Sequence, residues 1–272
     1  MIAERERMLD EQWKKWGPYV SNRQWGTVRE DYSHNGNAWG HTTYNDAISR
    51  AYRWNEDGIA GICDDKQLLC FAFSFWNRKD KMIKERFFGL SNHEGNHGED
   101  IKEIFYYLDN TPSHSYMKMV YKYSIEQFPY EQLIYENARR SKTDPEFELV
   151  DTGIFNRNEY FDLFIEYAKI NHDDFAIRVT AVNRSTRKAP LVILPTLWYR
   201  NNWNWGHGTY QPQLKSSVKG IIDIEHDSIS QKKFYARNPD TETLFCDNET
   251  NYEKIKSLVS DAKFFKDGIM TF

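Results

Sequence analysis

The residues whose types and spacing most suggest chemistry are His93, Glu94 and His97, which match the H-E-x-x-H pattern of zinc proteases. That chemistry needs a helix, because only positions i and i+4 on one face point both imidazoles at one metal, beside a glutamate base. Three glycines in or beside the motif lower the helix propensity by roughly 2 to 3 kcal/mol relative to alanine. The sequence therefore favours a polar loop between strands, with no metal or cofactor, and leaves a zinc hydrolase as the remote alternative.

The same stretch continues into further acidic residues and forms a dense polar cluster. Its candidate contact residues are Glu94, His97, Glu99 and Asp100. Such side chains can hydrogen-bond a hydroxylated ligand or another domain, and loops carry function more often than core elements do. A plain solvated turn is the competing interpretation.

A long segment from residue 17 to residue 45 is rich in Gly, Asn, Ser, His and Trp, and its candidate contact residues are Trp25, Arg29, Asp31 and Trp39. A sugar can stack its apolar face on a Trp ring while an Arg and a carboxylate take its hydroxyls. On the residues alone, an internal Arg29–Asp31 or Arg29–Glu30 pair that holds the loop is an equally good explanation.

A second aromatic loop, residues 203–208, has the same character, and its candidate contact residues are Trp203, Trp205 and His207. Buried packing or a contact with another domain competes with sugar binding here as well. Hydrolysis of a glycosidic bond needs two carboxyl groups at a defined separation, which one sequence cannot show. No catalytic pair is therefore predicted among the 40 acidic residues, and the chain has no nucleophile elbow, P-loop or Rossmann fingerprint.

The composition of the chain limits the classes of partner that it is expected to bind. A formal net charge of −4 with interspersed signs predicts neither a nucleic acid nor a membrane surface as partner. Cys63, Cys70 and Cys246 are an odd set, which favours buried thiols in a reducing compartment. A charged start and the absence of a long apolar run predict a cytoplasmic protein. The aromatic content of 16% suits either a β core or a sugar-stacking surface.

The elements that must position these residues are mostly strands. An amphipathic helix is predicted over residues 3–16, a second helix over 128–141 and a short third one over 251–256. Alternating or continuous apolar patterns predict strands at 68–76, 104–108, 116–123, 161–167, 175–181, 191–194, 218–224 and 233–236, before a weak C-terminal strand. No linker or repeat divides the chain. The pattern predicts a mainly β fold, one large antiparallel β-sandwich over residues 1–272, on which residues 1–45 pack.

Several ordered blocks resemble bacterial glucosidases of glycoside hydrolase family 63, which are related to processing α-glucosidase I. These blocks are residues 16–32, 50–58, 94–100, 111–118 and 194–201. The resemblance implies a super-β-sandwich of the galactose-mutarotase-like type, followed by a catalytic barrel of paired helices that carries the general acid and base.

The chain ends before that barrel, so no catalytic residue is carried over. The resemblance implies the N-terminal, non-catalytic domain of an enzyme acting on α-glucosides or oligosaccharides, inactive by itself. Its partner would be the catalytic domain or a separately encoded half. A stand-alone carbohydrate-binding module is the alternative function. A sandwich without its barrel should expose a large aromatic face, so self-association or poor solubility is expected, and a monodisperse monomer in sedimentation would contradict this.

Overall fold

The computed structural model describes residues 2–17, 35, 43–52, 57–89, 94–96, 101–206, 210–238, 240–259 and 264–271. The chain groups into two compact units: unit 1 comprises Met1–Ile48 and Trp54–Leu197, and unit 2 comprises Ser49–Arg53 and Trp198–Phe272. The single domain over residues 1–272 stays a prediction, because this grouping does not test whether either unit folds alone. Within the described ranges, no helix is both long enough and apolar enough to cross a membrane.

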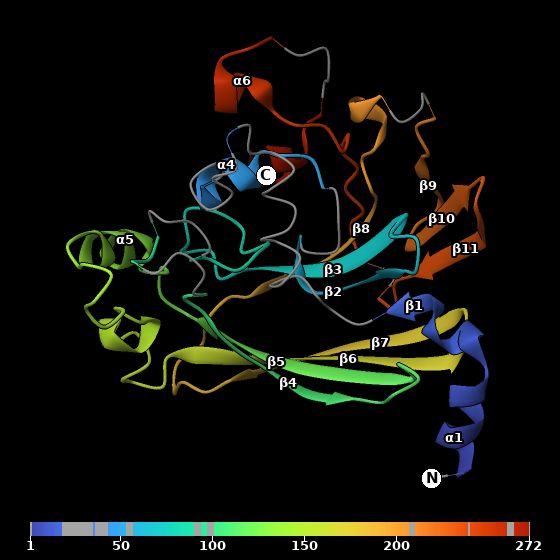
Figure 1. Ribbon diagram of the computed structural model, residues 1–272, viewed down its shortest axis with the longest axis horizontal. Helices are drawn as coiled ribbons and strands as arrows, with labels where there is room; N and C mark the ends of the chain where they lie inside the picture. Colours follow the sequence, from blue (N-terminus) through green and yellow to red (C-terminus); the bar gives the residue numbers. More distant parts are fainter. Residues whose placement is uncertain are drawn as a thin grey trace. The chain divides into compact units, whose positions relative to one another are not determined.

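The fold is mainly β, which confirms the predicted class (Figure 1). The strands are β1 (Trp16–Gly17), β2 (Ile59–Asp64), β3 (Leu69–Trp76), β4 (Ile104–Asn110), β5 (Tyr116–Ser124), β6 (Tyr160–Asn171), β7 (Asp174–Asn183), β8 (Val192–Tyr199), β9 (Leu214–Val218), β10 (Ile221–His226) and β11 (Ile229–Tyr235). The α-helices are α1 (Ile2–Leu9), α4 (Tyr44–Ile48), α5 (Tyr130–Ala138) and α6 (Tyr252–Lys256). Short 3-10 helices are η1 (Glu11–Lys15), η2 (Leu149–Thr152), η3 (Trp203–Trp205) and η4 (Lys266–Thr271).

Unit 1 contains two sheets, with strand orders β1-β2-β3-β8 and β4-β5-β6-β7. The last two residues of β8, Trp198 and Tyr199, belong to unit 2. The second sheet is a meander, because β4, β5, β6 and β7 pair in sequence order and each pair is antiparallel. On β6, Leu163, Ile165 and Tyr167 are fully buried, but Asp162 and Glu166 of the opposite face are buried as well, so the period-two alternation is incomplete. This alternation is the pattern that predicted the strand from the sequence.

Aromatic side chains join the two sheets of unit 1. Phe71 and Phe73 of β3 contact the Tyr167 ring of β6, with centroids 6.2 and 6.5 Å apart. Phe75 likewise lies 6.2 Å from the ring of Tyr121 on β5. Residues two apart on a strand share a face, so one face of β3 packs on the inner face of the meander. Unit 1 is therefore a β-sandwich whose core is aromatic.

Two predicted strands differ from the structure. The expected strand at 218–224 is divided into β9 and β10 by a turn in which Gly220 adopts a φ of +79°, a conformation that glycine reaches without strain. The expected C-terminal strand is wrong for the described residues, since 266–271 form the 3-10 helix η4. Unit 2 thus holds a three-stranded sheet of order β11-β10-β9.

The early segment Ser49–Tyr52 belongs to unit 2 through polar contacts with the end of the chain. Asn248 accepts the Tyr52 backbone N–H at 2.6 Å and donates to the Tyr52 carbonyl at 2.7 Å. The backbone N–H of Asn251 donates to the Ser49 carbonyl at 2.8 Å. These bonds satisfy backbone groups that no strand partner takes, which explains why residues about 200 positions apart share one unit.

The leading helix is shorter than the predicted 3–16. Helix α1 ends at Leu9, and the separate 3-10 helix η1 begins after Asp10, whose carboxylate accepts the Gln12 N–H at 3.0 Å. An aspartate that caps a new turn competes with continuation of the preceding helix. Downstream, the buried Lys169 of β6 donates from Nζ to the carbonyls of Trp13 and Trp16, the latter at 2.9 Å. Burial lowers the pKa of Lys169 to about 8.

The loop between β4 and β5 closes on itself and binds helix α1. The Thr111 N–H donates to the Tyr116 carbonyl and the Tyr116 N–H donates to Thr111 Oγ1, both at 3.0 Å, and the Thr111 and Ser115 hydroxyls lie 2.9 Å apart. The Glu4 carboxylate accepts the Ser113 N–H at 2.8 Å and the Ser115 hydroxyl at 3.0 Å. This loop lies in the 111–118 block, so that block has a structural role.

Glu4→Gln is expected to remove a pH-dependent part of the stability. Burial acts to raise the pKa of Glu4, but hydrogen bonds from Ser113, Ser115 and Arg7 outweigh it and lower the pKa to about 2, from 4.5. A depressed carboxyl pKa stabilises the fold above pH 4.5, and this contribution is lost as pH falls through 2. In urea unfolding at pH 6, 4 and 3, the free energy of unfolding of wild type should exceed that of Glu4→Gln, by an amount that decreases as the pH falls. The exposed Glu6→Gln, on the same helix, is the control; an equal effect there would contradict the prediction.

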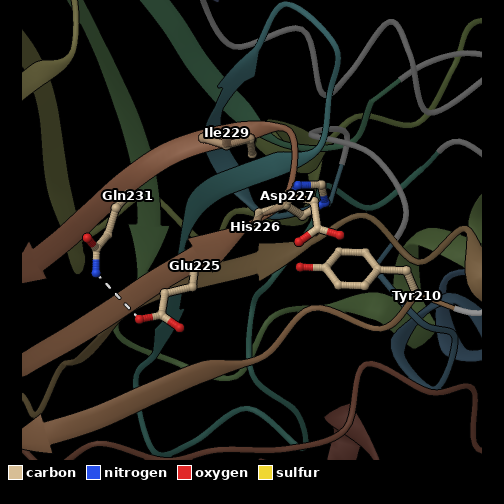
Figure 2. Close-up of a pocket in the computed structure, with 6 residues that line it drawn as sticks. All are labelled: Tyr210, Glu225, His226, Asp227, Ile229 and Gln231. Carbon is tan, nitrogen blue, oxygen red and sulfur yellow. Dashed lines mark hydrogen bonds between the residues drawn. The ribbon is translucent and has the colours of Figure 1, made fainter.

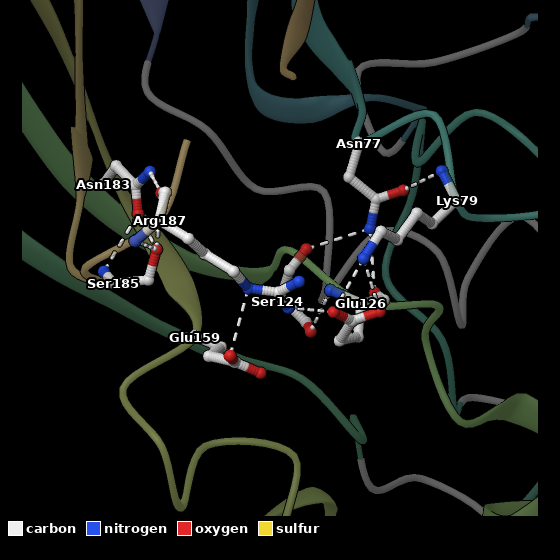
Figure 3. Close-up of polar contacts among 8 residues, drawn as sticks. All are labelled: Asn77, Lys79, Ser124, Glu126, Glu159, Asn183, Ser185 and Arg187. Carbon is white, nitrogen blue, oxygen red and sulfur yellow. Dashed lines mark hydrogen bonds and ion pairs between the residues drawn. The ribbon is translucent and has the colours of Figure 1, made fainter. Parts of the chain in front are cut away.

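An exposed polar network joins the ends of β3, β5 and β7 (Figure 3). Glu126 accepts both Lys79, at 2.6 Å, and Arg187, which also pairs with Glu159 at 3.0 Å. The fully buried Asn77 donates to the carbonyls of Ser124 and Glu126, both at 2.9 Å. Solvent-exposed pairs contribute little individually, so Asn77 is the member of this network that matters most for the fold.

The cysteines partly follow the prediction of buried thiols. Cys63 and Cys70 are buried on β2 and β3, and Cys246 is half-buried. None of the three is in a disulfide.

Candidate functional site

Glu94, the glutamate of the sequence motif, has a structural role. Glu94 is only 4% exposed, and its carboxylate accepts the backbone N–H of Tyr44 at 2.6 Å and that of Gly89 at 3.2 Å. Residues 94–96 form a turn and a bend rather than a helix. The helical placement that a zinc-protease motif needs is therefore absent from the described part of the motif.

Most other sequence-predicted contact residues lie outside the described residues. These are Trp25, Arg29, Asp31, Trp39, His97, Glu99, Asp100 and His207. Within the ranges that the structure covers, no group of three or more His, Cys, Asp or Glu side chains could hold a metal ion.

The aromatic loop of unit 2 begins with η3. The Trp203 indole N–H donates to Glu249 Oε1 at 2.8 Å, and the Asn204 side chain donates to the other oxygen of the same carboxylate. The Asn204 backbone N–H donates to Asn201 Oδ1 at 3.3 Å, and Asn201 in turn donates to the Asn248 carbonyl at 2.6 Å. The polar edge of Trp203 is thus occupied by Glu249, and the loop is anchored to the C-terminal part of unit 2.

A buried ion pair in unit 1 has no counterpart in the sequence predictions. Lys84 Nζ donates to Glu103 at 2.7 Å, and neither side chain has exposed surface. The Phe88 N–H, at 2.9 Å, and the Tyr121 hydroxyl donate to the same carboxylate. Burial raises the pKa of Glu103, and Lys84 and the hydrogen bonds only partly offset this. A pair without contact to solvent serves the fold rather than a reaction.

Aromatic rings surround the cation of that pair. Lys84 Nζ lies 3.7 Å from the Phe128 ring centroid, 4.5 Å from that of Tyr130 and 5.2 Å from that of Tyr44. Cation–π attraction strengthens when water is excluded. In the sequence, Lys84 stands in the run Lys84-Glu85-Arg86, which has the composition of a solvated surface, so no local pattern marks it as buried.

An open recess in unit 2 is a better candidate for ligand binding than the buried ion pair of unit 1, because solvent reaches it. It has a volume of about 410 Å³ and lies at the end of the β10–β11 hairpin, lined by Tyr210, Glu225, His226, Asp227, Ile229 and Gln231 (Figure 2). Two carboxylates, an amide, an imidazole and a phenol therefore surround one space. Tyr210 follows the predicted aromatic loop 203–208 closely in sequence, whereas no sequence argument singled out the hairpin residues.

The strand register and the turn fix the hairpin side of the recess. His226 and Ile229 are partners across a two-residue turn, in which His226 Nδ1 accepts the Ser228 N–H at 3.0 Å. An imidazole that accepts at Nδ1 carries its proton at Nε2 when neutral. The His226 ring contacts two tyrosines, with centroids 5.4 Å from Tyr199 and 5.3 Å from Tyr210. Its orientation is therefore restrained by the Ser228 N–H and by two ring contacts.

The two carboxylates are presented differently. Gln231 donates to Glu225 at 3.4 Å across the hairpin, whereas Asp227 stands in the turn, where its side chain and Tyr210 point toward one another (Figure 2). Glu225, Asp227 and Tyr210 are all exposed. This arrangement can accept several hydrogen bonds from a ligand that enters from solvent.

Comparison with known proteins gives one informative similarity. The chain is 47% identical over 207 residues to the uncharacterized protein YMR196W of Saccharomyces cerevisiae (strain ATCC 204508 / S288c), a match that covers 72% of this chain. It covers 19% of that relative, so the chain spans about a fifth of the relative's length. No protein-family model and no solved structure match the chain.

Proposed function

We propose that this chain is a non-catalytic β-sandwich part of a glucosidase-like glycoside hydrolase, which supports a catalytic domain carried by a longer polypeptide or by a second chain. The observation that carries the proposal is the sandwich of unit 1, since residues of the glucosidase-like blocks build it. Block 111–118 forms the closed loop that leads into β5, and block 194–201 contains most of β8. The match to about a fifth of a longer relative supports a part that works beside other domains.

The proposal assigns no catalytic residue to this chain. Inverting and retaining glycosidases need two carboxyl groups about 5 to 9.5 Å apart on either side of the scissile bond. The buried carboxylates of unit 1 are engaged with backbone or side-chain donors, as Glu94 and Glu103 show. We therefore expect these carboxylates to maintain the scaffold. We also propose that the protein is cytoplasmic.

Hydrolysis of α-glucosides tests this function directly. The purified chain should be inactive alone and should give turnover when mixed with the polypeptide encoded downstream. A mutant of the scaffold, Lys84→Met, should reduce the activity of the mixture if the sandwich is required. Enzyme-like turnover by this chain alone, or full activity of the downstream polypeptide alone, would refute the assignment.

A stand-alone carbohydrate-binding module is the second candidate, and the recess in unit 2 favours it. Such a module needs no downstream partner, so it would bind sugar while the mixture stays inactive.

A further inference from the structure

Strand β7 forms an open edge of the meander in unit 1. It ends the strand order β4-β5-β6-β7 and, among the described residues, pairs with β6 alone. The strand is ten residues long, contains neither proline nor lysine, and pairs without a register shift from Phe175 to Asn183. The opposite edge, β4, has a register shift between Tyr107 and Asp109. Proteins usually protect edge strands by shortness, lysine, proline or a bulge, so β7 is the edge that is open to another strand.

The strand pairing shows which backbone groups of β7 face the open edge. The Arg184 N–H donates to the Tyr160 carbonyl of β6 at 2.9 Å, whereas the N–H of Lys169, the partner of Phe175, donates away from β7 to Ser115 at 2.8 Å. Successive residues of an antiparallel strand direct their backbone groups to opposite sides. The even-numbered residues of β7 therefore bond β6. The residues whose N–H and C=O groups point to the open edge are Phe175, Ile177, Val179, Ala181 and Asn183.

The side chains of these outward-bonding residues form an apolar row that is incompletely covered. The row lies on the inner face of the meander, opposite residues of β6 that are fully buried, such as Ile165. On β7, however, Ile177 and Val179 are only half-buried and Ala181 is exposed. A strand added at this edge would place its own side chains beside the row and remove more apolar surface from water.

The charges of β7 fit a second copy of the same strand. If two copies pair antiparallel with Val179 on the twofold axis, Asp174 of each copy lies opposite Arg184 of the other. Asp174 is exposed and forms no ion pair with any residue in the described ranges. The Arg184 side chain is 45% exposed and pairs with Asp162 through Nε. A guanidinium has five N–H donors, so Arg184 can bind a second carboxylate.

The same register gives the longest pairing. It uses all of β7 and places Ile177 of one copy opposite Ala181 of the other, while Val179 lies opposite itself. These are apolar cross-strand pairs of the kind that stabilise sheets. A shift that puts Arg178 on the axis would instead oppose two arginines, and like charges directly opposite each other are destabilising.

We propose that two copies of this chain pair through β7, antiparallel about Val179, so that their two meanders form one continuous sheet. The same edge serves both copies, so the interface is isologous and closes at a dimer. This inference goes beyond the proposed function, and neither depends on the other.

Sedimentation velocity of the full chain tests the interface. Wild type should dimerise reversibly as its concentration is raised to about 200 μM, a range that reveals a dimer of micromolar Kd. Val179→Pro should stay monomeric, because it removes an N–H that the second copy needs. That N–H points away from β6, and proline is tolerated at such edge positions. Tyr106→Ala, on the β4 edge, is the control and should dimerise as wild type does.

A charge variant tests the register without a backbone change. Asp174→Lys should weaken the dimer about tenfold, because it places like charges opposite each other at both ends of the paired strands. It also keeps the test decisive if Val179→Pro does not fold. Far-UV circular dichroism at low protein concentration, where every variant is monomeric, verifies the fold of each.

A cross-link locates the twofold axis. Val179→Cys places the thiols of two copies opposite each other, so a short bismaleimide should join the chains into a covalent dimer. Tyr106→Cys, on the other edge, should give no more covalent dimer than wild type, whose half-buried Cys246 sets the background.

Three results would overturn the inference: a wild type that stays monomeric at the highest concentration, a dimer that folded Val179→Pro and Asp174→Lys leave intact, or cross-linking of Tyr106→Cys in place of Val179→Cys. A monomeric wild type that binds the downstream polypeptide, with binding lost in Val179→Pro, would assign the same edge to another partner and refute the second copy.

Discussion

Lys84→Met is expected to lower the free energy of unfolding by about 3 to 5 kcal/mol, because it leaves Glu103 charged and buried without a cation. Both side chains have no exposed surface, and their Nζ–Oε1 distance is 2.7 Å. Folded domains are stable by only about 5 to 15 kcal/mol, so this loss is a large fraction of the total. Urea denaturation at pH 7 measures it. The matched control is Lys81→Met, which removes a lysine from the exposed pair with Glu131 and should change little.

The pH dependence of this variant provides a second readout. Burial already raises the pKa of Glu103, and loss of Lys84 should raise it further. A carboxyl whose folded pKa lies above its unfolded pKa contributes stability that is present below the unfolded pKa and lost as pH rises through the folded one. The deficit of Lys84→Met should therefore be smaller at pH 5 than at pH 8.

A double variant keeps the test decisive if Lys84→Met does not fold. In Lys84→Met with Glu103→Gln, the new amide oxygen can still accept the Phe88 N–H, and no charge remains buried. It should regain a large part of the lost stability. A double variant no more stable than the single one would show that the deficit comes from altered packing around residue 84 rather than from an uncompensated charge.

Phe73→Ala should cost about 3 to 5 kcal/mol, the range for removal of a buried aromatic side chain. Phe73 is 2% exposed and its ring contacts those of Phe71, at 5.2 Å, and Tyr167, at 6.5 Å. Its removal opens a cavity between the two sheets of unit 1, where lost dispersion contacts add to the lost burial.

The size dependence of the effect distinguishes a cavity from a general disturbance. Phe73→Leu fills most of the volume and should cost much less than Phe73→Ala in urea denaturation. Tyr106→Ala removes an exposed ring on β4 and should change the stability of the fold little. Equal losses for Phe73→Ala and Tyr106→Ala would contradict an aromatic core between the sheets.

Local patterns predicted much of the fold. The alternation at 161–167 and 175–181 identified β6 and β7, and the apolar run at 68–76 identified β3, because period two in a strand is a property of neighbouring residues. Errors occurred where one residue changed the local backbone, as at Gly220 between β9 and β10 and at Asp10 after α1. β2 escaped prediction because it is buried on both faces and shows no alternation.

The sequence by itself therefore determined the mainly β class and the strand positions in the meander, whereas the family resemblance stays a prediction. Only the tertiary structure decided that Lys84 and Glu103 meet in the core, and that Tyr210 shares a recess with Glu225, His226 and Asp227. The physical reason is range: strand periodicity acts between neighbours, whereas these contacts join residues about 15 to 20 positions apart, whose meeting depends on strand register and packing.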